Sequence, residues 1–121
     1  MILGLRTSIY PVSDLTAAKT WYSSVLGVAP YFDEPFYVGF TVGGFELGLI
    51  PDGTSSVDGC QALWGVANAE QAMQQLLSLG AHEVEAVTEV GGGIKVASVR
   101  DPFGNRFSII ENPHFDVSAV R

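Results

Sequence analysis

The order of expected elements in this 121-residue chain repeats once along the sequence. Asp14 and Asn68, each suited to cap the start of a helix, are 54 positions apart (68 − 14). Gly27 and Gly80, suited to end the same two helices, are 53 positions apart (80 − 27). In each half one β-prone segment precedes the helical segment and three follow it. This duplication predicts an α+β fold built from two βαβββ modules.

The local patterns place the elements of each half. In the first half we expect strands over residues 5–12, 29–32, 36–42 and 45–50 and a helix over 15–26. In the second half we expect strands over 60–66, 82–87, 94–100 and 106–111, with a helix between Asn68 and Gly80. Gly43-Gly44 indicates a two-residue hairpin, and the polar stretch 51–56 a linker. The chain is therefore predicted to be a single domain, 1–121, with modules over 1–52 and 58–115.

Each module has only one helix to cover a four-stranded sheet. The second face of each sheet stays bare unless the two sheets curve around a shared space. We therefore expect an open, barrel-like cleft, which is a natural site for a small organic molecule.

Composition excludes several classes of function. The formal net charge of −7 disfavours nucleic acid and anionic membrane surfaces as partners. Neither a signal peptide nor an apolar run long enough to span a membrane is visible. Cys60 is the only cysteine, which fits a reducing, cytoplasmic location, and we expect it to be buried and inert.

Three motifs resemble a known superfamily. Asp101-Pro102-Phe103-Gly104-Asn105 forms a turn before an apolar strand, Val12-Ser13-Asp14-Leu15 begins a helix with Trp21-Tyr22, and Val25-Leu26-Gly27 ends it. Together with the repeat, these motifs are similar to those of the vicinal oxygen chelate superfamily. Its members include glyoxalase I, extradiol dioxygenases and bleomycin-resistance proteins. The resemblance covers nearly the whole chain and implies paired βαβββ modules.

The resemblance also implies where a metal would be bound. Metal-dependent members take one ligand from the first and one from the last strand of each module. The matching positions here are Thr7, Glu46, Gln61 and Ser108. Two neutral hydroxyls in such a set are poor ligands for a transition metal. The histidines, His82 and His114, lie outside these positions. We therefore expect no cofactor, with a divalent metal as the alternative.

Strand alternation predicts which side chains line the cleft. The expected cleft residues are Thr7, Ile9, Glu46, Gly48, Gln61, Leu63, Ser108 and Ile110, with Phe40 at the rim. Their neighbours on the opposite face, expected to pack under the helices, are Phe45, Leu47, Ala62, Trp64, Phe107 and Ile109. The missing side chain of Gly48 is expected to leave room for a ligand.

Glu46 is the one carboxylate expected in this apolar cleft, and it has three interpretations. It faces a cationic or hydrogen-bond-donating ligand, or it is hydrated or paired with an arginine or lysine such as Arg6, Arg100 or Lys95. As the only candidate catalytic residue, it would act as a general base.

Two classes of function follow from these expectations. The first is a small-molecule-binding protein of the glyoxalase/bleomycin-resistance type, which holds an apolar or cationic ligand without a catalytic metal. The alternative is an enzyme, either a metal-dependent lyase or dioxygenase resembling glyoxalase I or a metal-free enzyme using Glu46. The resemblance also implies a homodimer.

Overall fold

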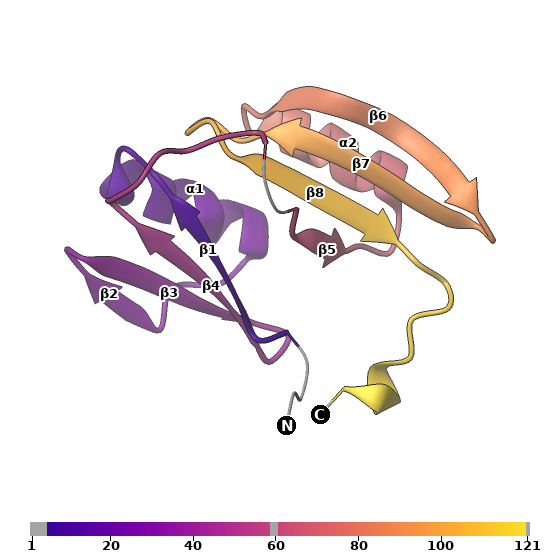
Figure 1. Ribbon diagram of the computed structural model, residues 1–121, viewed down its shortest axis with the longest axis horizontal. Helices are drawn as coiled ribbons and strands as arrows, with labels where there is room; N and C mark the ends of the chain where they lie inside the picture. The colour runs from indigo at the N-terminus through magenta and orange to yellow at the C-terminus, as the bar shows by residue number, and fades with distance from the viewer. Residues whose placement is uncertain (1–4, 59–60, 121) are drawn as a thin grey trace.

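The computed structural model describes residues 5–58 and 61–120 and contains two copies of one unit (Figure 1). The first unit consists of β1 (Thr7–Pro11), α1 (Leu15–Leu26), β2 (Phe32–Glu34), β3 (Tyr37–Val42) and β4 (Phe45–Ile50). The second consists of β5 (Leu63–Gly65), α2 (Ala69–Ser78), β6 (His82–Gly91), β7 (Ile94–Arg100) and β8 (Arg106–Glu111), followed by a 3₁₀ turn (Val117–Ala119). No helix in the described part of the chain is long and apolar enough to cross a membrane.

The two sheets have the same topology. Their strand orders are β1-β4-β3-β2 and β5-β8-β7-β6. In each sheet the first strand pairs in parallel with the last strand, and the other pairs are antiparallel. This confirms the predicted α+β fold of two βαβββ modules. The sheets remain separate and do not close into a barrel.

Helix caps were correctly predicted because their signals are local. The Asp14 side chain accepts a hydrogen bond from the Ala17 amide at 3.0 Å, and Asn68 accepts one from Gln71 at 2.9 Å. Gly27 ends α1 in the left-handed region with φ of 71°. These contacts satisfy amides that an isolated helix end would leave unpaired.

Three strands differ most from the expected ranges, whereas β1 and β3 differ by only one or two residues at their ends. β6 continues to Gly91, because its pairing with β7 reaches the glycine turn between them. β5 is limited to Leu63–Gly65, and the expected burial of Cys60 concerns a position outside the described residues. β2 covers Phe32–Glu34 instead of 29–32, and Asp33 in it forms an ion pair of 2.9 Å with Lys19.

The core lies between the sheets and the two helices. Its fully buried side chains include Tyr22, Leu47 and Leu49 of the first module and Val99 of the second. Leu47 thus packs on the helix side as expected, as do Phe107 and Ile109. The same expectation is wrong for Phe45, which is exposed at the start of β4 beside the hairpin turn.

The turn of the Asp-Pro-Phe-Gly-Asn motif joins the two modules. Oδ1 of the buried Asp101 accepts hydrogen bonds from the amides of Phe103 and Asn105 at 2.9 Å each. Its Oδ2 accepts the Tyr22 hydroxyl of α1 at 2.5 Å. The side-chain amide of Asn105 donates through Nδ2 to the Pro11 carbonyl of β1 at 2.6 Å. Residues of the second module therefore fix the helix and first strand of the first.

Candidate functional site

The face of each sheet that is turned away from its helix carries the predicted cleft residues, and we call it the open face. In the first sheet Thr7 pairs with Glu46 and Ile9 with Gly48 across β1 and β4. In the second sheet Leu63 pairs with Ser108, and Ile110 follows two residues later on the same face.

Phe40 does not belong to this set. It pairs with Leu47 and is completely buried in the helix-side core. Its expected place at the rim of the cleft is wrong, because it lies an even number of residues from Val38 and therefore shares that residue's buried face.

Glu46 is held by two tyrosines. One carboxylate oxygen accepts the hydroxyl of Tyr31, just before β2, and the other accepts the hydroxyl of Tyr37 at the start of β3. These bonds hold the pKa of the Glu46 carboxyl below its ordinary value, and the bond from Tyr31 makes the larger contribution. Burial, followed by the bond to Glu46, raises the pKa of Tyr37 to about 12.

An ion pair with an arginine or lysine, one of the interpretations of Glu46, is not found among the described residues. Within residues 5–58 and 61–120 the ion pairs join Lys19 to Asp33, Lys95 to Glu70 and Arg106 to Glu85. Among the described residues the contacts of the Glu46 carboxylate are phenol hydroxyls and not a salt bridge.

Two glycines form the floor beneath these tyrosines. A Cβ atom at Gly48 would overlap the hydroxyl and ring of Tyr37. A Cβ atom at Gly39 would lie 3.0 Å from the rings of both Tyr31 and Tyr37. Gly48 was expected to leave open room, but the room is occupied by Tyr37. The expectation failed because it considered the glycine without the tyrosine on the neighbouring strand.

The open face of the second sheet carries neutral polar groups and one arginine. The Ser108 hydroxyl is completely buried, lies 2.9 Å from the Ser98 hydroxyl and donates to Gln61 Oε1 at 3.4 Å. Arg106 donates through Nε to the Ser98 hydroxyl at 3.2 Å, and its terminal nitrogen lies 2.7 Å from Glu85. The polar groups here are satisfied mostly by one another.

The four positions assigned by the resemblance do not fit a transition metal. They offer two hydroxyls, an amide and one carboxylate, and both oxygens of that carboxylate already accept hydrogen bonds from phenols. The Ser108 hydroxyl is engaged with Ser98, and the two exposed histidines lie elsewhere. Within the described parts of the chain no three His, Cys, Asp or Glu side chains gather in a metal-binding arrangement. Zinc, nickel and iron sites use imidazole, thiolate or several anionic oxygens.

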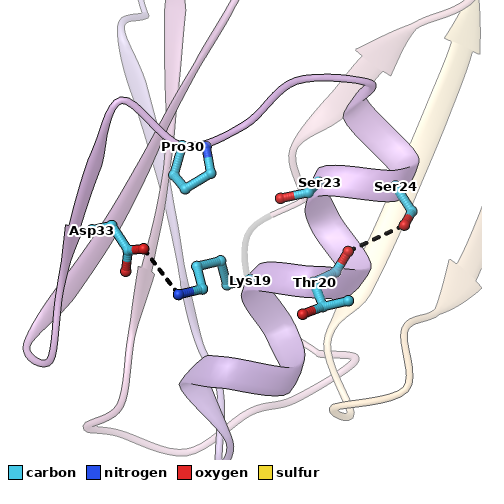
Figure 2. A pocket seen from close by; sticks show the side chains of 6 residues that line it. All are labelled: Lys19, Thr20, Ser23, Ser24, Pro30 and Asp33. Carbon is cyan, nitrogen blue, oxygen red and sulfur yellow. Dashed lines mark hydrogen bonds and ion pairs between the residues drawn. The ribbon is translucent and has the colours of Figure 1, made fainter.

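Two hollows lie on the helix side of the molecule. Figure 2 shows the first, of about 470 Å³, between α1 and β2, lined by Lys19, Thr20, Ser23, Ser24, Pro30 and Asp33. Its side chains largely satisfy one another, since Lys19 binds Asp33 and the Thr20 and Ser24 hydroxyls donate to carbonyls of their own helix. The second, of about 240 Å³, is an apolar crevice between the two modules, bounded by the end of α1, α2 and β5.

Comparison with known families accounts for this architecture. The model of the Glyoxalase/Bleomycin resistance protein/Dioxygenase superfamily matches residues 5–109. The chain belongs to this superfamily. A comparison with curated proteins finds no match.

Solved structures of the glyoxalase superfamily share the fold. A glyoxalase-related enzyme from Fulvimarina pelagi matches with a TM-score of 0.78 and 20% identity, over 98% of this chain and 95% of that one. A lactoylglutathione lyase from Agrobacterium tumefaciens matches with a TM-score of 0.77 and 19% identity, over 96% and 100% of the two chains. A superfamily member from Sphaerobacter thermophilus matches with a TM-score of 0.73 and 20% identity, over 93% and 99%. At these identities the likeness is one of fold, and function must be argued from the site.

Sequence reasoning missed the partners of the predicted site residues. Tyr37 could have been found, because it lies two residues before Gly39 and thus on the open face of β3. Tyr31 precedes β2, where no strand alternation applies, and its contact with Glu46 depends on the fold.

Proposed function

We propose that this glyoxalase-superfamily chain is a small-molecule-binding protein that holds an apolar organic ligand against its open face without a catalytic metal. The observation that carries the proposal is the state of the two last-strand positions. Both Glu46 oxygens accept hydrogen bonds from phenol hydroxyls, and Ser108 is buried against Ser98. Side chains of the protein itself thus occupy the groups that would otherwise hold an ion.

Apolar side chains on the first strand of each module support this proposal. Ile9 on β1 is 52% exposed, and Leu63 on β5 is 50% exposed. Both lie on the open face, and a Cβ atom at Gly65 would have no neighbour within 4 Å. Complete burial of an aliphatic side chain contributes roughly 1.5–3 kcal/mol. A ligand that covers Ile9 and Leu63 would gain part of that amount at each.

The chemistry of Glu46 disfavours the enzyme alternatives. A general base works best when its pKa is close to the working pH. The two phenols move the pKa of Glu46 in the opposite direction, away from neutrality. The metal-dependent alternative would require donors that the four positions do not supply.

The test combines metal analysis with a binding assay for a neutral apolar probe, N-phenyl-1-naphthylamine. The fluorescence of the probe reports its binding. Protein purified without chelator is expected to contain far less than one divalent ion per chain. It should bind the probe equally well before and after EDTA treatment. A stoichiometric metal whose removal abolishes a lyase or dioxygenase activity would refute the proposal.

Two variants locate the probe. Ile9→Asp and Leu63→Asp each place a charge on the open face and should weaken probe binding several-fold. Val117→Asp is the matched control, because Val117 is an exposed apolar residue of the 3₁₀ turn, outside both sheets. Equal weakening in all three variants would show that the probe does not report on the open face.

A further inference from the structure

Glu46 lies beside a cluster of exposed aromatic rings. The ring centroids of Tyr31 and Phe32 are 6.4 Å apart, and that of Phe32 lies 6.0 Å from those of both Phe36 and Tyr37. Tyr31 is 60% exposed, Phe32 38% and Phe36 64%. These four rings and the Glu46 carboxylate form what we call the tyrosine–carboxylate cluster.

The tyrosine–carboxylate cluster carries a negative charge on Glu46. The phenols of Tyr31 and Tyr37 donate hydrogen bonds to Glu46 and carry no positive charge. Their donation favours the ionised carboxylate, so Glu46 is negative at neutral pH. No lysine or arginine in the described parts of the chain forms an ion pair with it.

The geometry of the cluster is fixed by the sheet beneath it. A Cβ atom at Gly48 would overlap Tyr37, and one at Gly39 would lie tightly, at 3.0 Å, against the rings of Tyr31 and Tyr37. The absence of a Cβ atom at both positions lets the rings lie close against β3 and β4. Their hydroxyls are thereby held on the two oxygens of a single carboxylate, and the rings stay available at the surface.

We propose that the tyrosine–carboxylate cluster binds the quaternary ammonium group of a small organic cation. An ammonium group gains from the negative charge of Glu46 and from the electron-rich faces of aromatic rings. A quaternary ammonium needs no hydrogen-bond acceptor. It therefore suits a carboxylate whose oxygens already accept hydrogen bonds from two phenols. This inference rests on the proposed function, since it assigns the charged end of the ligand that the open face would hold.

The test compares choline with 3,3-dimethylbutan-1-ol, which has the same shape but carbon in place of the charged nitrogen. Binding is followed by the amide NMR signals of the full chain. Choline is expected to shift the signals of Gly39 and Gly48 and to bind roughly tenfold more tightly than the neutral alcohol. Equal affinity for the two compounds would overturn the inference.

Variants separate the charge from the rings. Glu46→Gln should weaken choline binding about tenfold and leave the neutral alcohol unchanged. Glu83→Gln is the matched control, because Glu83 is an exposed β6 residue and the variant makes the same change in net charge. Tyr31→Leu removes a largely exposed ring, so folding is retained, and it should also weaken choline several-fold. Unchanged choline affinity in Glu46→Gln or Tyr31→Leu would contradict the inference.

The neutral naphthylamine probe distinguishes this inference from the proposed function. If the probe binds the open face and choline does not bind, the ammonium site is refuted and the proposed function stands. If neither compound binds, both are refuted.

Discussion

Asp101 serves the fold and not the ligand. It is buried on the helix side, and its oxygens accept the Tyr22 hydroxyl and two backbone amides. The Asp-Pro-Phe-Gly-Asn motif, on which the resemblance to the superfamily was based, thus connects the two modules. Gly104 supplies the left-handed backbone with φ of 93°, whereas Asn105 contributes its side-chain amide.

Removing the Asp101 carboxylate should therefore destabilise the chain without affecting the open face. Asp101→Ala leaves the Tyr22 hydroxyl and two amides without their acceptor, which we expect to lower the free energy of unfolding by about 2–4 kcal/mol. Asp52→Asn, a change at an exposed loop carboxylate, should stay within about 0.5 kcal/mol. Urea unfolding measures both, and similar values for the two variants would contradict the structural role.

The tyrosines give a spectroscopic readout of the Glu46 site. The pKa values of Tyr10 and Tyr22 are raised first by burial, that of Tyr31 first by its bond to Glu46, and that of Tyr37 to about 12. Absorbance at 295 nm should therefore show tyrosine ionisation shifted to higher pH in the folded chain than in the unfolded chain. Glu46→Gln should lower the pKa of Tyr31 and, to a smaller extent, that of Tyr37, and leave the buried pair unchanged.

The same shift of Tyr37 fixes the sign of a pH dependence. Burial first, and then the bond to Glu46, place its pKa in the folded chain above the unfolded value of 10, so the protonated phenol contributes its full stability below pH 10. That contribution is lost as the pH rises from 10 through about 12. The difference in unfolding free energy between the native chain and Tyr37→Phe should accordingly shrink over this interval.

Among the elements, β4 shows how backbone and side chain share the open face. Gly48→Ala places a methyl group where the Tyr37 hydroxyl lies, and we expect a loss of about 1–3 kcal/mol together with displacement of Tyr37. Gly65→Ala, at an uncrowded position of β5, should change stability by less than about 0.5 kcal/mol. Thermal unfolding and the tyrosine titration together would reveal whether the two substitutions behave alike.

Sequence patterns predicted those elements whose signals are local. Four elements have the expected bounds, namely α1, β4, β7 and β8. Their caps, glycine turns and strand alternation are determined by residues that are close in sequence. β2 and β5 are short and differ from the expected ranges. β2 begins where the expected strand ends, and β5 covers only three residues of its expected range, since its partner strand β8 is distant in sequence. For the site, alternation indicates which residues share the open face, but only the fold brings Tyr31 to Glu46.

At the scale of the whole molecule, the two modules are held together by several long-range contacts. Trp21 of α1 donates to the Leu79 carbonyl after α2 at 2.9 Å, and Trp64 of β5 donates to the Tyr10 hydroxyl of β1 at 3.2 Å. Both tryptophans of the chain thus lie at the junction. The modules share one core and cannot separate without breaking it.

We therefore expect the modules to unfold in one cooperative transition. Tryptophan fluorescence would report the junction and far-ultraviolet circular dichroism the helices and strands of both modules. Their denaturation midpoints should coincide. A fluorescence change that precedes the loss of secondary structure would show that the junction opens before the modules unfold.

The duplicated unit presents different chemistry in its two copies. The last strand of the first module offers Glu46 beneath aromatic rings, and that of the second offers Ser108 among hydroxyls with Arg106 nearby. A duplication with identical side chains would accept an elongated guest in either direction. If the proposed ligand contacts both sheets, the unlike side chains of the two modules would favour one orientation of it over the reverse.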